Sequence, residues 1–307
     1  WGSPYFQNQG EPYLDGAQYI IIPEDATRIS ALQTGDIDMI HGSDAVPVDK
    51  VKQLQKMEGI KIVEAPMVGV VMVFLNTTQK PLDDMRVRKA INYAVDKKKL
   101  IALALDDLAE PAYSPVASSY TSVYHTELKT KIGYDYDLDK AKALLKEAGQ
   151  ESGFKVEFAT FDGALWRRIA EIIKEDLAKV NIDVSIASLP VGELFAKAKE
   201  ATSGMYQAWY TYGEPDIVYQ FLHTEQAFWW DRHVNPELDK LIEEQRTEFD
   251  PEKRKELFWK IQEIVVDEAY WIPLYEGKYF AAMKNYVNGV TIDHLGFHHL
   301  CDIWIDK

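Results

Sequence analysis

The clearest structural pattern in the chain is FLNTTQKPLDDMRVRKAINYAVDKKKLI, which runs from Phe74 to Ile101. Its first residues end an apolar run that begins at Val68, and this run predicts a buried strand through Asn76. Asp84 then occupies the position of a helix N-cap. Four apolar residues follow at spacings that place them on one helix face: Val87, Ile91, Ala94 and Val95. A strand followed by an amphipathic helix is typical of an α/β fold.

The same alternation of strands and helices continues on both sides of this stretch. Short apolar or alternating runs predict further strands at 19–22, 60–65, 155–161, 184–186 and 272–275. Apolar residues at helical spacing predict helices at 26–34, 138–148 and 165–180, and two more that open at the pairs Asn235-Pro236 and Asp250-Pro251. No internal repeat or low-complexity linker interrupts the pattern. We therefore expect an α/β architecture.

The composition excludes several classes of protein. The 307 residues hold 34 Lys and Arg against 49 Asp and Glu, so the formal net charge is −15. A nucleic-acid-binding surface needs clustered Lys and Arg, and this acidic balance argues against one. No apolar run approaches the roughly 20 residues that span a bilayer. Cys301 is the single cysteine, which rules out an intrachain disulfide and a thiolate metal cage.

A search for catalytic and metal-binding motifs is mostly negative. The patterns HExxH, GxSxG, GxxxxGK and GxGxxG are all absent. Near the C-terminus, four potential metal ligands lie close together: His294, His298, His299 and Cys301. Their spacing resembles no standard zinc site. We therefore expect neither a metal nor a cofactor.

Two acidic residues are the strongest candidates for catalysis. Glu214 and Asp216 stand two positions apart in a Gly-Glu-Pro-Asp turn. A glycosidase needs two carboxyl groups that flank one bond at about 5–9 Å, and a proline turn is poorly suited to that task. We favour a capped turn that leads into a helix and expect no enzyme. A hydrolase that uses Glu214 and Asp216 is the alternative.

Aromatic residues give the positive signal for ligand binding. The chain holds 8 Trp and 17 Tyr, and two loop-like stretches, AWYTYGEPD and AFWWDRH, concentrate them. The candidate binding residues in these stretches are Trp209, Tyr210, Tyr212, Trp229 and Trp230, with Glu214 and Asp216 beside them. Rings in a loop either pack in the core or bind a ligand, because exposing them to water is costly. Arg167, at the start of a predicted helix, is a candidate partner for a ligand carboxylate.

The segment from Phe74 to Ile101 resembles the signature region of the family 5 extracellular solute-binding proteins, the oligopeptide-, dipeptide- and nickel-binding components of ABC importers. Four other stretches are similar to the family in the same order: YLDGAQYIIIPEDATRISALQTGDIDM, YDYDLDKAKALLKEAG, RRIAEIIKEDLAKVNIDVSI and NPELDKLIEEQRTEFDPEKRKELFWKIQEIVVDEAYWIPLY. The resemblance extends to about Gly289. It implies a periplasmic binding protein-like α/β fold, with two lobes joined by hinge strands at 68–73 and 272–275.

The resemblance also implies a division into domains. Proteins of this family are longer than this sequence, so we expect a C-terminal fragment with an incomplete first lobe. Residues 1–69 and 276–307 would be the remainder of domain I, and residues 70–275 would be domain III, a complete ligand-binding lobe. Domain II and the start of domain I would be absent. On this interpretation the remainder of domain I exposes an unpaired sheet edge.

The function implied by the resemblance is delivery of a peptide to an ABC importer. The lobes would close over the ligand outside the cytoplasm, in the periplasm or at the outer face of the membrane, without catalysis. An oligosaccharide is the alternative ligand, because aromatic rings suit neutral sugars, and nickel ranks below both. Permease subunits would be the partners, and the membrane would be met only through them or through a lost lipid anchor. A solute sensor that docks on a membrane receptor is a further alternative.

One departure from the family bears on the ligand. In the family's peptide binders, a Trp-x-x-Asp stretch supplies the Asp that holds the ammonium group of the peptide. Alignment on Trp209 puts Tyr212 at that position, whereas alignment on Pro215 makes Glu214 the nearest acid. The missing Asp weakens the case that this chain recognises an α-ammonium group.

Overall fold

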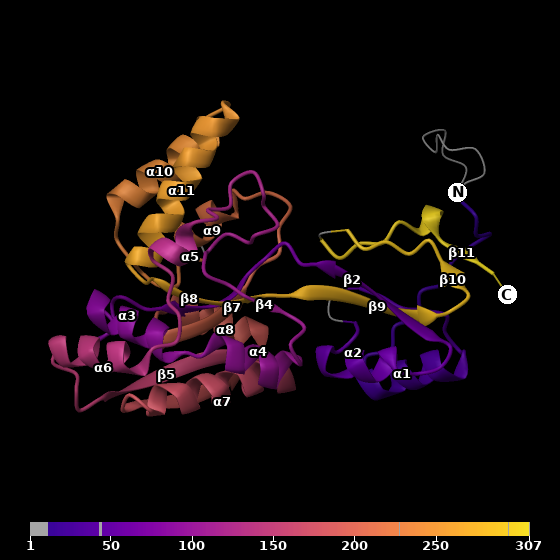
Figure 1. Cartoon of the computed structure of the whole chain (residues 1–307), viewed down its shortest axis with the longest axis horizontal. Helices are drawn as coiled ribbons and strands as arrows, with labels where there is room; N and C mark the ends of the chain where they lie inside the picture. The colour runs from indigo at the N-terminus through magenta and orange to yellow at the C-terminus, as the bar shows by residue number, and fades with distance from the viewer. Residues whose placement is uncertain (1–11, 43–44, 227, 294, 307) are drawn as a thin grey trace. The chain divides into compact units, whose positions relative to one another are not determined.

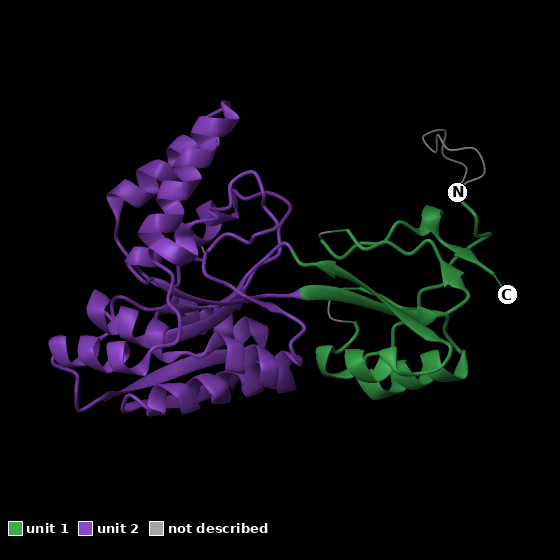
Figure 2. Cartoon of the chain, in the orientation of Figure 1, with its two compact units in different colours: residues 1–67, 278–307 green, residues 68–277 purple. Residues whose placement is uncertain are grey.

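The chain divides into two compact units (Figures 1 and 2). The computed structural model describes residues 12–42, 45–226, 228–293 and 295–306. Unit 1 holds residues 1–67 and 278–307, and unit 2 holds residues 68–277. Unit 2 is therefore one continuous segment, which begins after Met67 and ends at Gly277.

A six-stranded mixed sheet forms the centre of unit 2, in the order β4-β8-β3-β7-β5-β6. Its strands are β3 (Val71–Leu75), β4 (Glu110–Pro111), β5 (Phe154–Phe161), β6 (Ile182–Leu189), β7 (Met205–Trp209) and β8 (Trp271–Glu276). Strand β3 pairs antiparallel with β7 and β8, whereas β5 runs parallel to β6 and β7. Every residue of β3 is buried, as expected for a continuous apolar run in the middle of a covered sheet.

Helices cover this sheet. Along the chain they are α3 (Met85–Ala94), α4 (Lys97–Leu105), α5 (Leu128–Lys131), α6 (Leu138–Glu147), α7 (Ala164–Ala178), α8 (Val191–Lys199), α9 (Ile217–Leu222), α10 (Pro236–Thr247) and α11 (Pro251–Asp267). Figure 1 shows α10 and α11 as a helical hairpin on one side of the sheet, with α6 and α7 on the other. The predicted caps are confirmed, because Asp84 accepts a hydrogen bond from the Arg86 N–H and Asn235 accepts one from the Leu238 N–H.

The core of unit 2 is rich in aromatic rings. Phe74 of β3 contacts the rings of Phe221, Trp230 and Trp271, with centroids 5.9, 5.7 and 4.7 Å away. These rings come from α9, from the segment after it and from β8. Aromatic pairs add to the free energy of burial, so this cluster holds α9 and the following segment firmly against the sheet.

Unit 1 contains a three-stranded antiparallel sheet in the order β1-β9-β2. Its elements are α1 (Asp25–Thr34), β1 (Met39–Ile40), α2 (Val48–Gln55), β2 (Ile60–Pro66), β9 (Lys278–Lys284), the paired strands β10 (Val287–Asn288) and β11 (Trp304–Ile305), and the short 3-10 helix η1 (Leu300–Asp302). Helix α1 ends at Gly35, whose φ of 85° lies in the left-handed region that favours glycine. Among the described residues, β1 and β2 pair only with β9, so both are edge strands.

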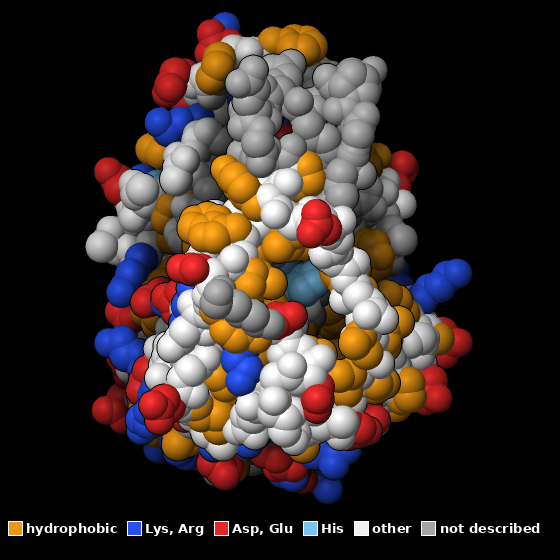
Figure 3. Space-filling view, turned by 90° about the vertical axis from the view of Figure 1, so that its right-hand side faces the viewer, with side chains coloured by type: hydrophobic (Ala, Val, Ile, Leu, Met, Phe, Trp, Pro, Cys, Tyr) orange, Lys and Arg blue, Asp and Glu red, His pale blue; other side chains and the backbone are white. Residues whose placement is uncertain are grey.

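The strand expected at 19–22 is wrong. Tyr19, Ile20 and Ile21 belong to no strand, and their side chains are 63%, 56% and 91% exposed. An apolar run forms a strand only where a sheet offers its hydrogen-bonding edge, and no described strand pairs with this segment. A hollow of about 330 Å³ lies beside it, lined in part by Tyr19 and His41. Figure 3 shows hydrophobic side chains at the surface of this unit.

Candidate ligand-binding site

The aromatic run after β7 is positioned by backbone pairing with the start of β3. The register of the two strands sets Trp209 opposite Val71. Beyond the strands, the pairing continues, because the N–H of Tyr212 donates to the carbonyl oxygen of Val68 at 3.2 Å. Non-local pairing with 68–71 therefore fixes which way each ring of the run points.

The two paired segments approach so closely that position 69 requires glycine. A Cβ on Gly69 would lie 1.7 Å from the carbonyl oxygen of Tyr210 and 2.8 Å from its carbonyl carbon. Backbone atoms cannot move aside as a flexible side chain can, so any other residue would push the aromatic run away from β3. The sequence patterns did not reveal this constraint at Gly69, since no turn or repeated motif marks the position.

A pocket of about 470 Å³ opens beside this run, entirely within unit 2. Its walls come from the end of β5, from α8, from β7 and the residues after it, from α9, and from the segment that follows α9. The aromatic lining consists of Phe161, Phe195, Trp209, Tyr210, Tyr212, Phe221, Phe228 and Trp230. None of the lining residues is charged, and Thr211 and Gln220 add uncharged polar groups. An uncharged aromatic cavity of this size suits a small organic group.

The rings of the lining also pack on the core. Trp209 stacks on Trp166 with centroids 5.3 Å apart, and Phe221 stacks on Phe228 at 5.2 Å. Tyr212 differs from them, because it is 52% exposed and so stands at the rim. The two interpretations of the aromatic stretches, core packing and surface display, therefore apply to different rings of one structure.

Tyrosine hydroxyls fix the aromatic run from the opposite side. The Tyr210 hydroxyl donates to the carbonyl oxygen of Pro115 at 2.7 Å, and the Tyr120 hydroxyl donates to the carbonyl oxygen of Tyr212. Burial raises the pKa of Tyr210 well above its ordinary value and raises the pKa of Tyr120 as well. Both hydroxyls therefore stay protonated and keep donating at any physiological pH.

The structure brings together four of the eight predicted binding residues. Trp209, Tyr210, Tyr212 and Trp230 line the pocket, whereas Arg167, Glu214, Asp216 and Trp229 do not. The ring of Trp229 lies 5.2 Å from the guanidinium carbon of Arg232. The guanidinium of Arg167 pairs with the Asp162 carboxylate at 3.3 Å, at the exposed start of α7.

Glu214 and Asp216 face arginines of the helical hairpin formed by α10 and α11. A Glu214 oxygen accepts a hydrogen bond from Arg254 at 2.7 Å, and Asp216 accepts one from Arg246 at 3.2 Å. Asp216 holds the N-cap position of α9, yet its side chain makes no capping bond, so the expected capped turn is wrong in this detail. The two carboxylates anchor the turn through ion pairs with arginines, and these long-range partners left no local pattern in the sequence.

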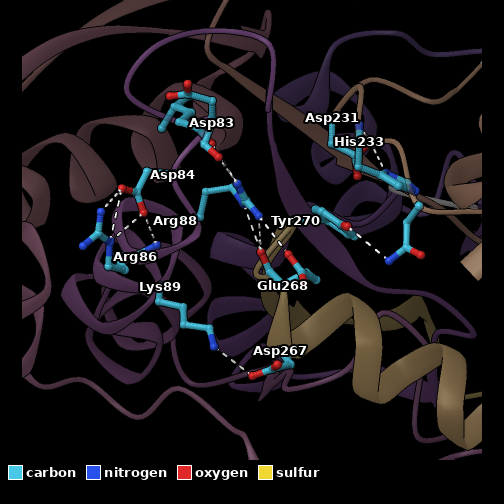
Figure 4. Close-up of polar contacts among 12 residues, drawn as sticks. Asp83, Asp84, Arg86, Arg88, Lys89, Asp231, His233, Asp267, Glu268 and Tyr270 are labelled. Carbon is cyan, nitrogen blue, oxygen red and sulfur yellow. Dashed lines mark hydrogen bonds and ion pairs between the residues drawn. The ribbon is translucent and has the colours of Figure 1, made fainter. Parts of the chain in front are cut away.

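A buried polar pair holds the segment that carries Phe228 and Trp230. Asp231 and His233 are both buried, and one Asp231 oxygen lies 2.7 Å from Nδ1 of His233 (Figure 4). The other Asp231 oxygen accepts a hydrogen bond from the indole of Trp271 at 2.8 Å, which ties the segment to β8. Sequence reasoning missed this pair. The one sign of this pair in the sequence is an acidic residue two positions before a histidine, inside an aromatic stretch.

A second buried network, also drawn in Figure 4, ties α3 to the end of α11. Arg88 is 3% exposed, and its guanidinium donates to the carbonyl oxygens of Leu82, Asp83 and Glu268 at 3.0, 3.1 and 2.8 Å. Burial lowers the pKa of Arg88 from its ordinary value. The network connects helices rather than lining the pocket, and its role is to hold the scaffold in place.

The histidines of unit 1 do not form a metal site in the part of the chain that the structure describes. No cluster of three or more metal-ligating side chains occurs there. The ring of His298 lies 4.7 Å from that of His41, and burial lowers the pKa of both. His294, one of the four candidate ligands, lies outside the described residues. The described helices include none that is long and apolar enough to cross a membrane.

An uncharged aromatic pocket on a mixed α/β unit is typical of proteins that bind a small organic solute. Comparison with known proteins gives the family. The model for the middle region of the bacterial extracellular solute-binding proteins, family 5, matches residues 2–230. The chain belongs to this family, as the resemblance predicted.

Individual relatives agree with this assignment. The chain is 28% identical over 314 residues to the dipeptide-binding protein of Escherichia coli, across 96% of this chain and 56% of that protein. It is 29% identical over 312 residues to heme-binding protein A of Haemophilus influenzae, across 97% of this chain and 55% of that protein. The solved structure of the periplasmic binding protein DppA from Helicobacter pylori, in complex with the peptide STSA, matches with a TM-score of 0.82 and 26% identity, over 93% of this chain and 56% of that one.

These comparisons confirm the predicted fold class, that of the periplasmic binding proteins. The chain spans about half the length of the relatives that it matches. The family that matches is one of extracellular solute-binding proteins, and these two relatives are named for what they bind. The two carboxylates of the hydrolase alternative, Glu214 and Asp216, are engaged in ion pairs with arginines.

Proposed function

We propose that this chain binds a peptide and presents it to the permease of an ABC importer, on the outer side of the cytoplasmic membrane. The observation that carries the proposal is the uncharged aromatic pocket between β7 and α9. A relative named for dipeptides and a neighbour that holds a peptide support this choice of ligand. The pocket is of a size to take one side chain, and the rest of the peptide would extend beyond it.

We assign unit 2 to the ligand-binding lobe, domain III of the family, and unit 1 to the remainder of domain I. The chain passes between the units twice, at 67–68 and at 277–278. Two such crossings can act as a hinge about which a lobe closes. The ligand selects the closed form because that form contacts it from both sides. No step of this cycle makes or breaks a covalent bond.

A neutral oligosaccharide is the second candidate ligand. The specific observation in its favour is that the lining combines many ring faces with no charged side chain. Sugar rings stack on aromatic faces, and their hydroxyl groups need neutral donors and acceptors such as the amide of Gln220.

Titration of the whole chain with peptides tests the proposal. Trp209 and Trp230 line the pocket, so a bound peptide should change the tryptophan fluorescence in a saturable way. The variant Tyr212→Ala removes a ring that is half exposed, and we expect binding to weaken about tenfold while the fold remains intact. The matched control is Tyr136→Ala, which removes a 39% exposed ring from outside this pocket and should bind peptide as the parent does.

Two results would contradict the proposal. The first is cleavage of the peptides during the titration. The second is the lack of saturable binding by any peptide in a library that varies length and side chains.

A further inference from the structure

The carboxylates nearest to the pocket lining along the chain are engaged elsewhere. Those within two residues of a lining residue are Asp162, Glu193, Glu214, Asp216 and Asp231. Arginines pair with three of them, at 3.3 Å for Asp162, 2.7 Å for Glu214 and 3.2 Å for Asp216. Asp231 is buried against His233 and Trp271.

The fifth carboxylate belongs to an exposed residue of α8. Glu193 stands two positions before Phe195, and residues two apart on a helix do not face the same way. None of the five carboxylates is therefore among the residues that line the pocket.

An ammonium group would find no counter-charge among the side chains that line this pocket. Transfer of a charge from water into an apolar site is unfavourable unless an opposite charge or several hydrogen bonds compensate it. Cation–π attraction is the remaining source of compensation, and it requires free ring faces. Trp209 already turns one face to Trp166, and Phe221 and Phe228 turn one face to each other.

The polar groups that do line the pocket are neutral. The side chain of Gln220 is exposed and belongs to the lining, and its amide can both donate and accept a hydrogen bond. Tyr212 brings a phenolic hydroxyl to the rim. These groups match an acyl carbonyl or an amide N–H, which need a single neutral partner.

We propose that the pocket binds an uncharged group of the ligand, and that where the amino end of a carried peptide enters the pocket, that end is acylated or closed into a ring. The inference rests on the proposed function of peptide binding. The residue seated against the lining is aromatic or aliphatic, since no lining side chain pairs with a charge.

A matched pair of ligands tests this inference. The probes are Phe-Ala-amide and N-acetyl-Phe-Ala-amide, which differ only in the ammonium group, titrated into the whole chain at pH 7. We expect the acetylated form to bind about tenfold tighter or more. Equal or tighter binding of the free amine would overturn the inference and leave peptide binding intact. If neither probe nor any other peptide binds, while maltotriose binds saturably, the peptide function fails and the uncharged pocket stands.

A charge placed in the lining provides a second, independent test. Gln220→Glu adds a carboxylate at an exposed lining position with little change in size. We expect it to shift the ratio of the two affinities about tenfold toward the free amine. Gln53→Glu makes the same change on the exposed face of α2 in unit 1 and should leave the ratio unaltered.

Two further outcomes would overturn the inference. One is an unchanged ratio in Gln220→Glu when circular dichroism shows it folded. The other is displacement of the acetylated probe from the parent by tetramethylammonium, which would identify a cation–π site instead.

Discussion

Replacement of Gly69 by alanine should lower the free energy of unfolding of unit 2 and distort the pocket. The φ of Gly69 lies outside the left-handed region, so alanine meets no backbone strain there. The whole cost is steric, because the added Cβ would lie 1.7 Å from the Tyr210 carbonyl oxygen, where an ordinary contact begins at 3.4 Å. The backbone segments of 68–71 and 209–212 must therefore separate.

The magnitude follows from the bonds that this separation breaks. The N–H of Tyr210 donates to Val70 at 3.4 Å and that of Tyr212 donates to Val68 at 3.2 Å. Each such bond is worth about 1 kcal/mol, and overpacking adds about 1–3 kcal/mol. The lower entropy of the unfolded alanine chain offsets about 0.4–1 kcal/mol of this. We expect Gly69→Ala to lower the free energy of unfolding by about 2–5 kcal/mol.

Urea unfolding followed by tryptophan fluorescence measures this change. Every tryptophan except Trp1 and Trp304 lies in unit 2, so the signal reports mainly that unit. Gly192→Ala is the matched control. Gly192 lies in α8, and no atom stands within 4 Å of the position that a Cβ would take there, so alanine should stabilise the helix by about 0.5–1 kcal/mol. The two substitutions should thus have opposite signs.

A Gly69→Ala variant whose free energy of unfolding lies within about 0.5 kcal/mol of the parent's would show that position 69 is not constrained, since such a difference is typical of an unconstrained surface site. A variant that is destabilised as expected but binds peptide as the parent does would separate the two claims. In that case the close approach would matter for stability and the aromatic wall would not depend on it.

The remaining expectations concern two buried cations. Arg88→Met removes the donor to three carbonyl oxygens and should lower the free energy of unfolding by about 3 kcal/mol. Lys89→Met removes only a surface ion pair and should lower it by less than about 1 kcal/mol. Equal effects of the two substitutions on urea unfolding would contradict this expectation. Burial lowers the pKa of Lys97 to about 7 from its ordinary 10.5. Between these two pKa values the unfolded chain binds more protons than the folded chain, so the free energy of unfolding of the parent should rise with pH from about 7 to 10.5, relative to that of Lys97→Met. If the difference in stability between parent and variant does not change with pH, the lowered pKa of Lys97 is contradicted.

The elements that were predicted correctly are determined by residues close to them in the sequence. Asp84, Asn235 and Asp250 each bond to a backbone N–H within three residues, so a pattern of a few letters was sufficient. The continuous apolar run of β3 likewise indicates a strand whatever its neighbours are.

The features that the sequence did not predict depend on distant partners. The segment 19–22 has the composition of a strand but no strand in the described chain pairs with it. The aromatic rings near position 209 were recognised, but only the pairing with 68–71 determines which of them reach the pocket. The arginines that pair with Glu214 and Asp216 lie about thirty to forty residues further on, beyond the reach of any local pattern.

The position of β9 has a consequence for biosynthesis. It is the middle strand of the sheet in unit 1, between β1 and β2, yet it is encoded after the whole of unit 2. During translation the amino-terminal strands must wait for about two hundred residues to leave the ribosome before their central partner emerges. Unit 2 needs no later residue, and its first and last strands, β3 and β8, lie side by side. The order of synthesis therefore favours completion of unit 2 before the sheet of unit 1 can form.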